Sequence, residues 1–341
     1  MLATARKRYK AFSIILFAFL LVLHFSVFFD AVQFGLASKT YDFAVYFRGA
    51  TLVKSDPEDI YTVKFDWELS SDPRWADILW AGYVYNELPW LAVMISPLTL
   101  TSYQEARVIW SSISLASAIG AGLLSLLLFK EKWMKLLILV LVMLVPIPPI
   151  GSSSDPSTLF IQTNLVGSSD EPLTRFLSLP YFETYFAGKA DAMILLLMLV
   201  SLYFAMNRDR DRFLRIPGWA LSAVFFALAS VEPHQVMELL PFWYVSNAVR
   251  KNAIRSSLVW VGMLALLNSL FLLYPNLLSA AYSVWVLRAS EATEIAVFFH
   301  LHHYVWLGTI PIIVLADLMM SLRVTTQGVF IKKQAATELA K

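Results

Sequence analysis

The chain has 341 residues, of which 58% are apolar and 15% are charged, and its net charge is +2. With a mean hydropathy of +0.62, this composition argues against a water-soluble domain, in which roughly a quarter of the residues are charged. The small net charge excludes a strongly basic surface for nucleic acid. Because the chain has no cysteine, disulfides, thiolate metal ligands and cysteine nucleophiles are excluded as well.

Apolar segments recur along the chain, each close to the roughly 20 residues needed to cross a hydrocarbon core about 30 Å thick. We predict an all-α polytopic membrane protein, a single membrane domain over residues 1–341 with about eight transmembrane helices. The predicted spans are Ala11–Phe29, Ala106–Phe129, Met134–Ile150, Ala187–Met206, Ile216–Val231, Val236–Val249, Ser256–Tyr274 and His302–Leu322. The first segment also has features of a signal peptide, but its length and the absence of a nearby small-x-small cleavage site favour a retained span.

Short basic clusters flank several spans, and their positions predict the orientation. They are Arg6–Lys10, Lys130–Lys135, Arg208–Arg215, Arg250–Arg255 and the segment from Arg323 that includes Lys332 and Lys333. The positive-inside rule places all of them in the cytoplasm, and therefore both termini as well, in a protein of the cell (plasma) membrane. The outer loops are then 30–105, 151–186, 232–235 and 275–301.

The first outer loop contains two segments with helical features. Apolar residues in Tyr41–Lys54 roughly follow helical spacing, which predicts a juxtamembrane amphipathic helix. The apolar segment Asn86–Leu100 barely reaches across a bilayer, and counting it as a span would invert every later basic cluster. We therefore expect it to lie in the outer interface or to form a re-entrant segment.

Two carboxylates are expected at the outer ends of helices that face the same compartment. Ionisable groups at a membrane boundary are costly unless they are paired or functional. Asp42 and Asp191 are in such positions, and a carboxylate there can act as general base toward a sugar hydroxyl. The structural alternative is that each residue simply caps its helix.

A histidine run and a proline-containing break are the remaining candidate sites in the predicted outer loops. His300, His302 and His303 form an HLHH run that suits a metal ion, an anionic substrate or an ordinary interface. Glu232-Pro233-His234 separates the predicted fifth and sixth spans. Such a break either lines a cavity, where its backbone groups find partners, or is a tight turn between two helices.

Three segments of the chain carry a family resemblance. They are YDFAVYFRGATLVKSDPEDIYT at 41–62, YVYNELPWLAVMISPLTLTSYQEARVIW at 83–110 and YFAGKADAMILLLMLVSLYFAMNRDRDRFLRIPGWALSAVFFALASVEPHQVMELLPFWYV at 185–245. Their order resembles the GT-C superfamily of membrane glycosyltransferases, in particular the polyprenol-phosphate-mannose-dependent mannosyltransferases. These share an Asp-containing helix after the first span, a Y-x-Y-x-x-Pro pattern and a Gly-x-x-Asp/Asn span.

The resemblance implies roles for individual residues. Asp42 matches the catalytic carboxylate, Glu87 lies near an acidic-basic-proline motif, and Asp191 lies near a second outer aspartate. The chain departs from the pattern at Leu88 and Glu232, where relatives carry lysine, and lost cations weaken a phosphate clamp. The substrate-binding candidates are Arg48, Glu87, Lys189, Asp191, His234, His300, His302 and His303. Arg48 and Lys189 are the cations expected to replace the missing lysines. The resemblance leaves open whether a divalent metal is a cofactor.

The resemblance implies an inverting glycosyltransferase. A sugar, with mannose expected, would pass from a polyprenyl-phosphate donor to a glycan, lipid or protein acceptor at the non-cytoplasmic face, with Asp42 as general base. Two alternatives are a transporter or flippase for a lipid-linked substrate and a non-catalytic membrane subunit. Ionisable residues are nearly absent from the predicted spans, with Asp317 as the main exception, which disfavours a transporter.

Overall fold

The protein is all-α, as predicted, apart from one short hairpin. The computed structural model describes residues 2–38, 42–61, 85, 87–143, 184–185, 188–206, 212–213, 216–231, 233–286 and 309–321. The hairpin pairs β1 (Arg212–Phe213) with β2 (Ile216–Pro217) in antiparallel register. The helical elements are α1 Leu2–Ser38, α2 Asp42–Ser55, η1 Pro57–Asp59, α3 Pro89–Ile95, η3 Ser96–Leu100, α4 Tyr103–Leu128, α5 Lys132–Val142, α9 Asp191–Met206, α10 Gly218–Ala229, α11 Pro233–Ala248, α12 Ala253–Leu267, α13 Leu270–Leu273, 275–286 and 309–321.

Helix α4 begins with a capping box. The Ser102 hydroxyl accepts a hydrogen bond from the Glu105 amide at 3.3 Å, and the Glu105 carboxylate accepts one from the Ser102 amide at 3.0 Å. Both bonds satisfy backbone donors that the first helical turn leaves without an internal partner. The cap therefore fixes where α4 starts, and with it the position of the first turns of this helix.

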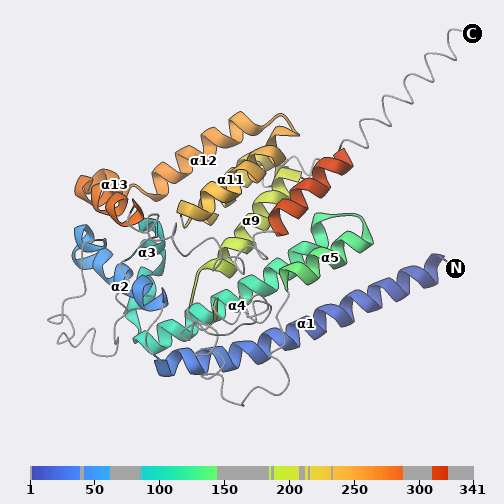
Figure 1. The fold of residues 1–341 in the computed structure, drawn as a ribbon, viewed down its shortest axis with the longest axis horizontal. Coiled ribbons are helices and arrows are strands. Elements are labelled where there is room, and N and C mark those ends of the chain that lie inside the picture. The colour runs from blue at the N-terminus through green and yellow to red at the C-terminus, as the bar shows by residue number, and fades with distance from the viewer. Residues whose placement is uncertain are drawn as a thin grey trace, which may run out of the picture.

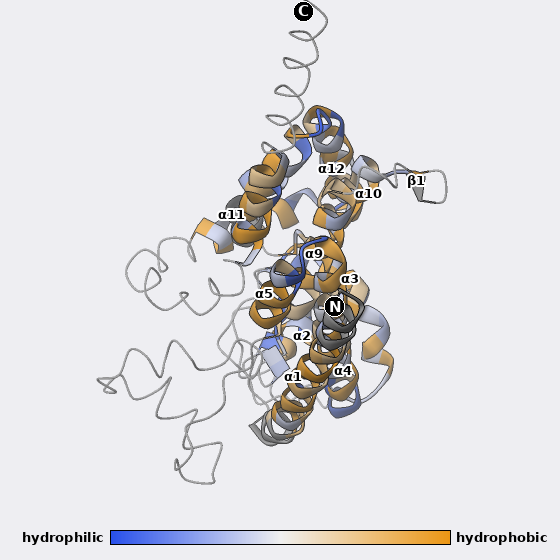
Figure 2. Ribbon diagram, turned by 90° about the vertical axis from the view of Figure 1, so that its right-hand side faces the viewer, coloured by the Kyte–Doolittle hydropathy of each residue, from blue (hydrophilic) through white to orange (hydrophobic). Residues whose placement is uncertain are grey.

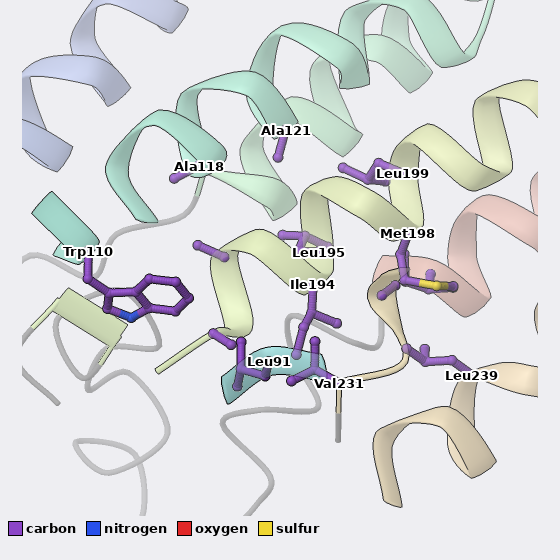
Figure 3. Packing of buried hydrophobic residues seen from close by; sticks show 14 of the residues in the cluster. Leu91, Trp110, Ala118, Ala121, Ile194, Leu195, Met198, Leu199, Val231 and Leu239 are labelled. Atoms are coloured by element: carbon purple, nitrogen blue, oxygen red, sulfur yellow. The ribbon is translucent and has the colours of Figure 1, made fainter. Parts of the chain in front are cut away.

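The core forms around α4 and α9, which run in the same direction. Near the start of α4, the Trp110 indole donates to the Gly188 carbonyl just before α9, and ten residues later a Cβ added at Gly120 would lie 3.3 Å from Leu196. Figure 3 shows the small side chains of Ala118 and Ala121 facing α9, which lets the two helices pack closely. The buried residues labelled there are Leu91, Trp110, Ala118, Ala121, Ile194, Leu195, Met198, Leu199, Val231 and Leu239.

A buried polar network joins α9, α10, α11 and α12. The Ser222 hydroxyl of α10 accepts a hydrogen bond from the Trp243 indole at 3.0 Å, and its carbonyl accepts one from the Ser201 hydroxyl at 2.7 Å. The Asn247 amide oxygen in turn accepts from the Ser256 hydroxyl at 2.9 Å. These bonds satisfy polar groups that would otherwise be costly to bury, so the network fixes the relative register of the four helices.

The segments that flank the basic clusters meet at one end of the bundle, which we call the basic end. The Tyr9 hydroxyl donates to the Lys132 carbonyl at 3.0 Å, and the Lys132 ammonium lies 5.1 Å from the Tyr9 ring centroid. Because α4 and α9 are parallel, Leu128 and Met206 also end on this side. Figure 1 shows α2, α3 and α13 gathered at the opposite end, on the left, with the N terminus and the α4–α5 connection on the right.

Two of the described helices are long and apolar enough to cross a membrane, namely Ala11–Phe29 and Tyr103–Leu128. Signal sequences and core helices of soluble proteins meet the same criterion, so it does not by itself assign the chain to a membrane. The other apolar helices are shorter, and α10 has 12 residues where the sequence predicted Ile216–Val231. Figure 2 nevertheless shows that hydrophobic residues make up much of each helix.

Both segments of the first outer loop that have helical features in the sequence form helices in the structure. A helix does start at Asp42, but α2 is not an amphipathic surface helix, because its first half from Phe43 to Ala50 is almost entirely buried. Helical periodicity did not reveal this burial, since α3 and α4 cover the face expected to meet solvent. The segment Asn86–Leu100 forms the short α3 and the 3-10 helix η3, packed against α2, and does not continue as one long helix.

Arg250 and Asp317 form a buried ion pair at the basic end. Two guanidinium nitrogens of Arg250 donate to the two Asp317 carboxylate oxygens at 2.7 and 2.8 Å. The same guanidinium donates to the carbonyls of Ser246 and Met206, near the ends of α11 and α9, at 3.1 Å each. Arg250 therefore ties α9, α11 and helix 309–321 together and satisfies carbonyls that the helix ends leave open.

Replacing Asp317 by Asn should strongly destabilise the fold, because the substitution leaves the Arg250 charge buried without its counter-charge. Breaking a buried pair of this kind costs about 3–5 kcal/mol. Thermal unfolding of the purified protein measures the effect, and Glu131→Gln, at an exposed position, is the matched control with little expected change. An Asp317→Asn variant as stable as the control would show that the pair does not hold the helices together.

Candidate functional site

The candidate site lies at the start of α2, at the end of the bundle opposite the basic end. Asp42 is the first residue of this helix and is half-buried, so its carboxylate lies at the positive end of the helix dipole and remains partly accessible. Phe43, the next residue, is fully buried and stacks on Trp110 of α4 with the ring centroids 6.0 Å apart. This stacking holds the first turn of α2, which contains Asp42, against α4.

Arg107 of α4 lies under the same turn. Its side chain is 1% exposed, its guanidinium carbon lies 5.6 Å from the Phe43 ring centroid, and Nη2 donates to the Tyr185 carbonyl at 3.2 Å. Phe43, whose ring this guanidinium faces, is the residue that follows Asp42. Arg107 therefore lies beneath the first turn of α2, where α2 and α4 join.

Gly188 brings the segment before α9 to this junction. Its φ of +74° lies in the left-handed region that glycine favours, and its carbonyl accepts the Trp110 indole hydrogen bond at 2.7 Å. A Cβ added at Gly188 would lie 2.7 Å from the Cβ of Phe43 and 2.0 Å from Arg107 Nη1. Only a residue without a side chain allows this approach of the three segments.

Lys189 and Asp191 follow Gly188 in the chain, so the start of α9 lies beside the first turn of α2. Lys189 is half-buried, and Asp191, the first residue of α9, is 6% exposed. Both side chains interact with the surrounding protein. Asp42, Arg107, Lys189 and Asp191 thus belong to three segments that meet at this junction.

Glu87 belongs to a neighbouring cluster between α2, α3 and the α10–α11 turn. It is 4% exposed, and its backbone carbonyl accepts a hydrogen bond from the Tyr61 hydroxyl. Burial, followed by the Glu87 charge, raises the pKa of Tyr61, and burial with the charges of Tyr61 and Glu87 raises the pKa of Tyr85. Both phenols therefore stay neutral and act as hydrogen-bonding groups at neutral pH.

Arg48 and the α10–α11 connection are two further candidates. Burial lowers the pKa of Arg48, and the Asp59 carboxylate of η1 opposes this shift. The break predicted at Glu232-Pro233-His234 falls between α10 and α11, where the Val231 carbonyl accepts a hydrogen bond from the Leu88 amide at 3.0 Å. Glu232 lies outside the described residues, as does the His234 side chain.

The histidine run cannot be placed, because His300, His302 and His303 lie outside the described residues. Within the described residues, no group of three or more His, Asp or Glu side chains is arranged to hold a metal ion.

Sequence reasoning missed Arg107 and Tyr185. Arg107 lies inside the predicted second span, and a charged residue within an apolar run is itself a signal of a paired or functional group. Tyr185 gives no comparable signal, because its role depends on its carbonyl and on its hydroxyl, which lies 2.9 Å from His24 Nδ1 of α1.

Compared with protein families, curated proteins and solved structures, the chain shows no match.

Replacing Gly188 by Ala should disrupt the junction, since the new methyl group would overlap Arg107 and Phe43 and the positive φ disfavours any side chain. We expect a loss of about 2 kcal/mol or more in the free energy of unfolding. Gly262→Ala is the matched control, because no atom lies within 4 Å of a Cβ there and alanine favours the helix. Equal stability of the two variants in thermal unfolding would contradict the close approach.

Proposed function

We propose that the chain is an integral membrane glycosyltransferase of the GT-C type that uses a polyprenyl-phosphate sugar, with mannose as the expected sugar. The observation that carries the proposal is the close approach of Gly188, just before α9, to Arg107 and to Phe43, the residue that follows Asp42. It lies at the end of the bundle opposite the basic clusters, where the positive-inside rule puts the non-cytoplasmic face.

Exposed apolar side chains support a membrane location. On α12, Ile254 is 73% exposed and Leu258 is 71% exposed, and further large apolar side chains are exposed on α1, α4 and helix 309–321. Water-soluble proteins rarely expose apolar surface that continues along several helices. In a lipid bilayer these apolar side chains contact hydrocarbon and are not exposed to water. The helices of 11 to 16 residues then cross only where the bilayer thins or where flanking residues extend them.

In the proposed reaction, the Asp42 carboxylate accepts the proton of the acceptor hydroxyl. The acceptor oxygen forms a bond to the anomeric carbon while the bond from that carbon to the phosphate oxygen breaks, with inversion. The polyprenyl phosphate leaves with the electron pair and is already anionic, so it needs electrostatic stabilisation and no general acid. Lys189, the residue after Gly188, is a half-buried cation on the same segment, and we assign it this role.

Asp317 favours transfer over transport. A transporter needs ionisable groups that change partners within its spans, and the sequence offered Asp317 as the main candidate. This carboxylate is held in a two-bond ion pair with Arg250 at the basic end. Such a pair stabilises one arrangement of helices, which suits a fixed scaffold around an active site.

The proposed orientation predicts opposite labelling of two single-cysteine variants. The chain has no cysteine of its own, so Glu58→Cys and Glu131→Cys, both at exposed positions, each introduce one reactive thiol. In intact cells, a membrane-impermeant maleimide should label position 58 but should label position 131 only after permeabilisation. Labelling of both positions in intact cells would refute the orientation.

Replacing Asp42 by Asn should abolish transfer while the protein stays folded, because the amide cannot accept the proton. We expect a loss of about 10²–10⁴-fold in rate, measured as release of the free lipid phosphate from a polyprenyl-phosphate sugar. Asp56→Asn, at an exposed position just after α2, is the control and should retain activity. An active Asp42→Asn variant would remove Asp42 from the mechanism.

A further inference from the structure

The segment from α12 to residue 286 carries no charge. Residues 256–286 contain no Asp, Glu, Lys, Arg or His, and at about 1.5 Å per residue one straight helix of this length would exceed a hydrocarbon core about 30 Å thick. The structure breaks the segment: α12 ends at Leu267, α13 follows, and a further helix covers 275–286. Because α13 lies at the end opposite the basic end (Figure 1), this last helix begins there as well.

One face of helix 275–286 packs against the bundle. Leu277 and Ala281, one turn apart, are fully buried. The Trp285 ring meets two other rings edge to face, with its centroid 6.2 Å from those of Tyr61 and of Phe271 in α13. Tyr61 and Phe271 are themselves stacked at 6.4 Å. The helix is therefore a fixed part of the fold, although the charge pattern assigned its residues to an outer loop.

The outward surface of helix 275–286 is divided into two strips. Residues four apart, or three and four apart, lie on the same side of a helix. The apolar strip is Leu278, Tyr282 and Val286, and the polar strip is Asn276, Ser279 and Ser283. All six side chains are exposed. With its packed face, the helix thus presents three surfaces, one to the protein, one apolar and one polar but uncharged.

The apolar strip belongs to a larger exposed apolar surface. Leu272 and Leu273 of α13 are 78% and 71% exposed, Leu258 is exposed on α12, and so are Phe12 and Ile15 on α1. A single protein partner covers one patch of a surface, whereas a bilayer contacts every helix that faces it. The distribution of exposed apolar residues over several helices therefore favours lipid as the occupant of the strip.

We propose that helix 275–286 lies along the outer membrane interface, with its apolar strip against the lipid acyl chains and its polar strip toward headgroups and water. Tyrosine and tryptophan are typical of this boundary, because their rings are apolar and their polar groups can reach water. A helix inside the hydrocarbon core would not need the polar strip, and a helix in water would not need the apolar one. The inference rests on the membrane location in the proposed function and is independent of the transfer reaction.

The proposed position brings outer-leaflet lipid close to the candidate site. Tyr61, which meets Trp285, donates a hydrogen bond to the Glu87 carbonyl, and Glu87 directly precedes the residues that lead into α3. Helix 275–286 thus lies on the lipid side of the cluster between α2 and α3. A lipid-linked donor could reach this end of the bundle without leaving the leaflet.

Spin labelling in vesicles tests the two strips. The chain has no cysteine, so Leu278→Cys, Tyr282→Cys, Ser279→Cys and Ser283→Cys each add one thiol for a nitroxide label, all at exposed positions. The full chain is reconstituted in vesicles of phosphatidylcholine and phosphatidylglycerol. Electron paramagnetic resonance then measures collisions with oxygen, which concentrates in lipid, and with a water-soluble nickel complex. The ratio of oxygen to nickel collisions should be higher at 278 and 282 than at 279 and 283.

Three results would overturn the inference. Nickel access at all four positions would make the helix an aqueous loop, and oxygen access without nickel at all four would bury it in the hydrocarbon core. Spin–spin broadening at position 282 would show that a second copy of the chain covers the apolar strip.

Two control positions separate this inference from the proposed function. A label at Leu258→Cys on α12 should contact oxygen, and one at Glu58→Cys in η1 should contact nickel. If the label at 258 contacts nickel, the membrane location fails, and with it both the proposed function and this inference. If 258 is in lipid while 278 and 282 contact nickel, only the inference about helix 275–286 fails.

Discussion

The close approach of three segments at Gly188 is the constraint on which the rest of the site depends. The backbone there adopts φ +74° and passes so near Phe43 and Arg107 that no side chain fits. This contact ties the start of α2 to α4 and to the start of α9, segments that are far apart in the sequence. Asp42 and Asp191 share one region of the protein because of it. The stacking of Phe43 on Trp110 and the Trp110 hydrogen bond to the Gly188 carbonyl stabilise the same arrangement.

Much of the architecture follows from the pattern of apolar and charged residues, whereas the site depends on tertiary packing. The helical class, the helix at Asp42 and the position at one end of the described helix ends that flank the basic clusters are consequences of apolar runs and charge placement. The burial of α2 was not predictable, because the elements that cover it come from residues 89–128. Arg107 was overlooked because apolar residues dominate the predicted span that contains it. The charge near Arg48 could not be predicted, because it depends on how η1 packs against α2.

Two arginines at opposite ends of the bundle, Arg250 and Arg107, have different surroundings. Arg250 and Asp317 form two hydrogen bonds and close the ends of α9 and α11, which makes the basic end rigid. At the other end, Arg107 is enclosed, whereas Asp42 at the start of α2 is only half-buried. The proposed transfer needs a fixed scaffold with an accessible general base, and a half-buried Asp42 is consistent with that requirement.

The most direct test of the proposed site is a structure of the protein in a lipid nanodisc with a bound polyprenyl phosphate, determined by cryo-electron microscopy. The account predicts density for the phosphate at the junction of α2, α4 and the start of α9, beside Asp42 and Lys189. Phosphate density at the basic end, or a junction closed to the lipid headgroup, would contradict it.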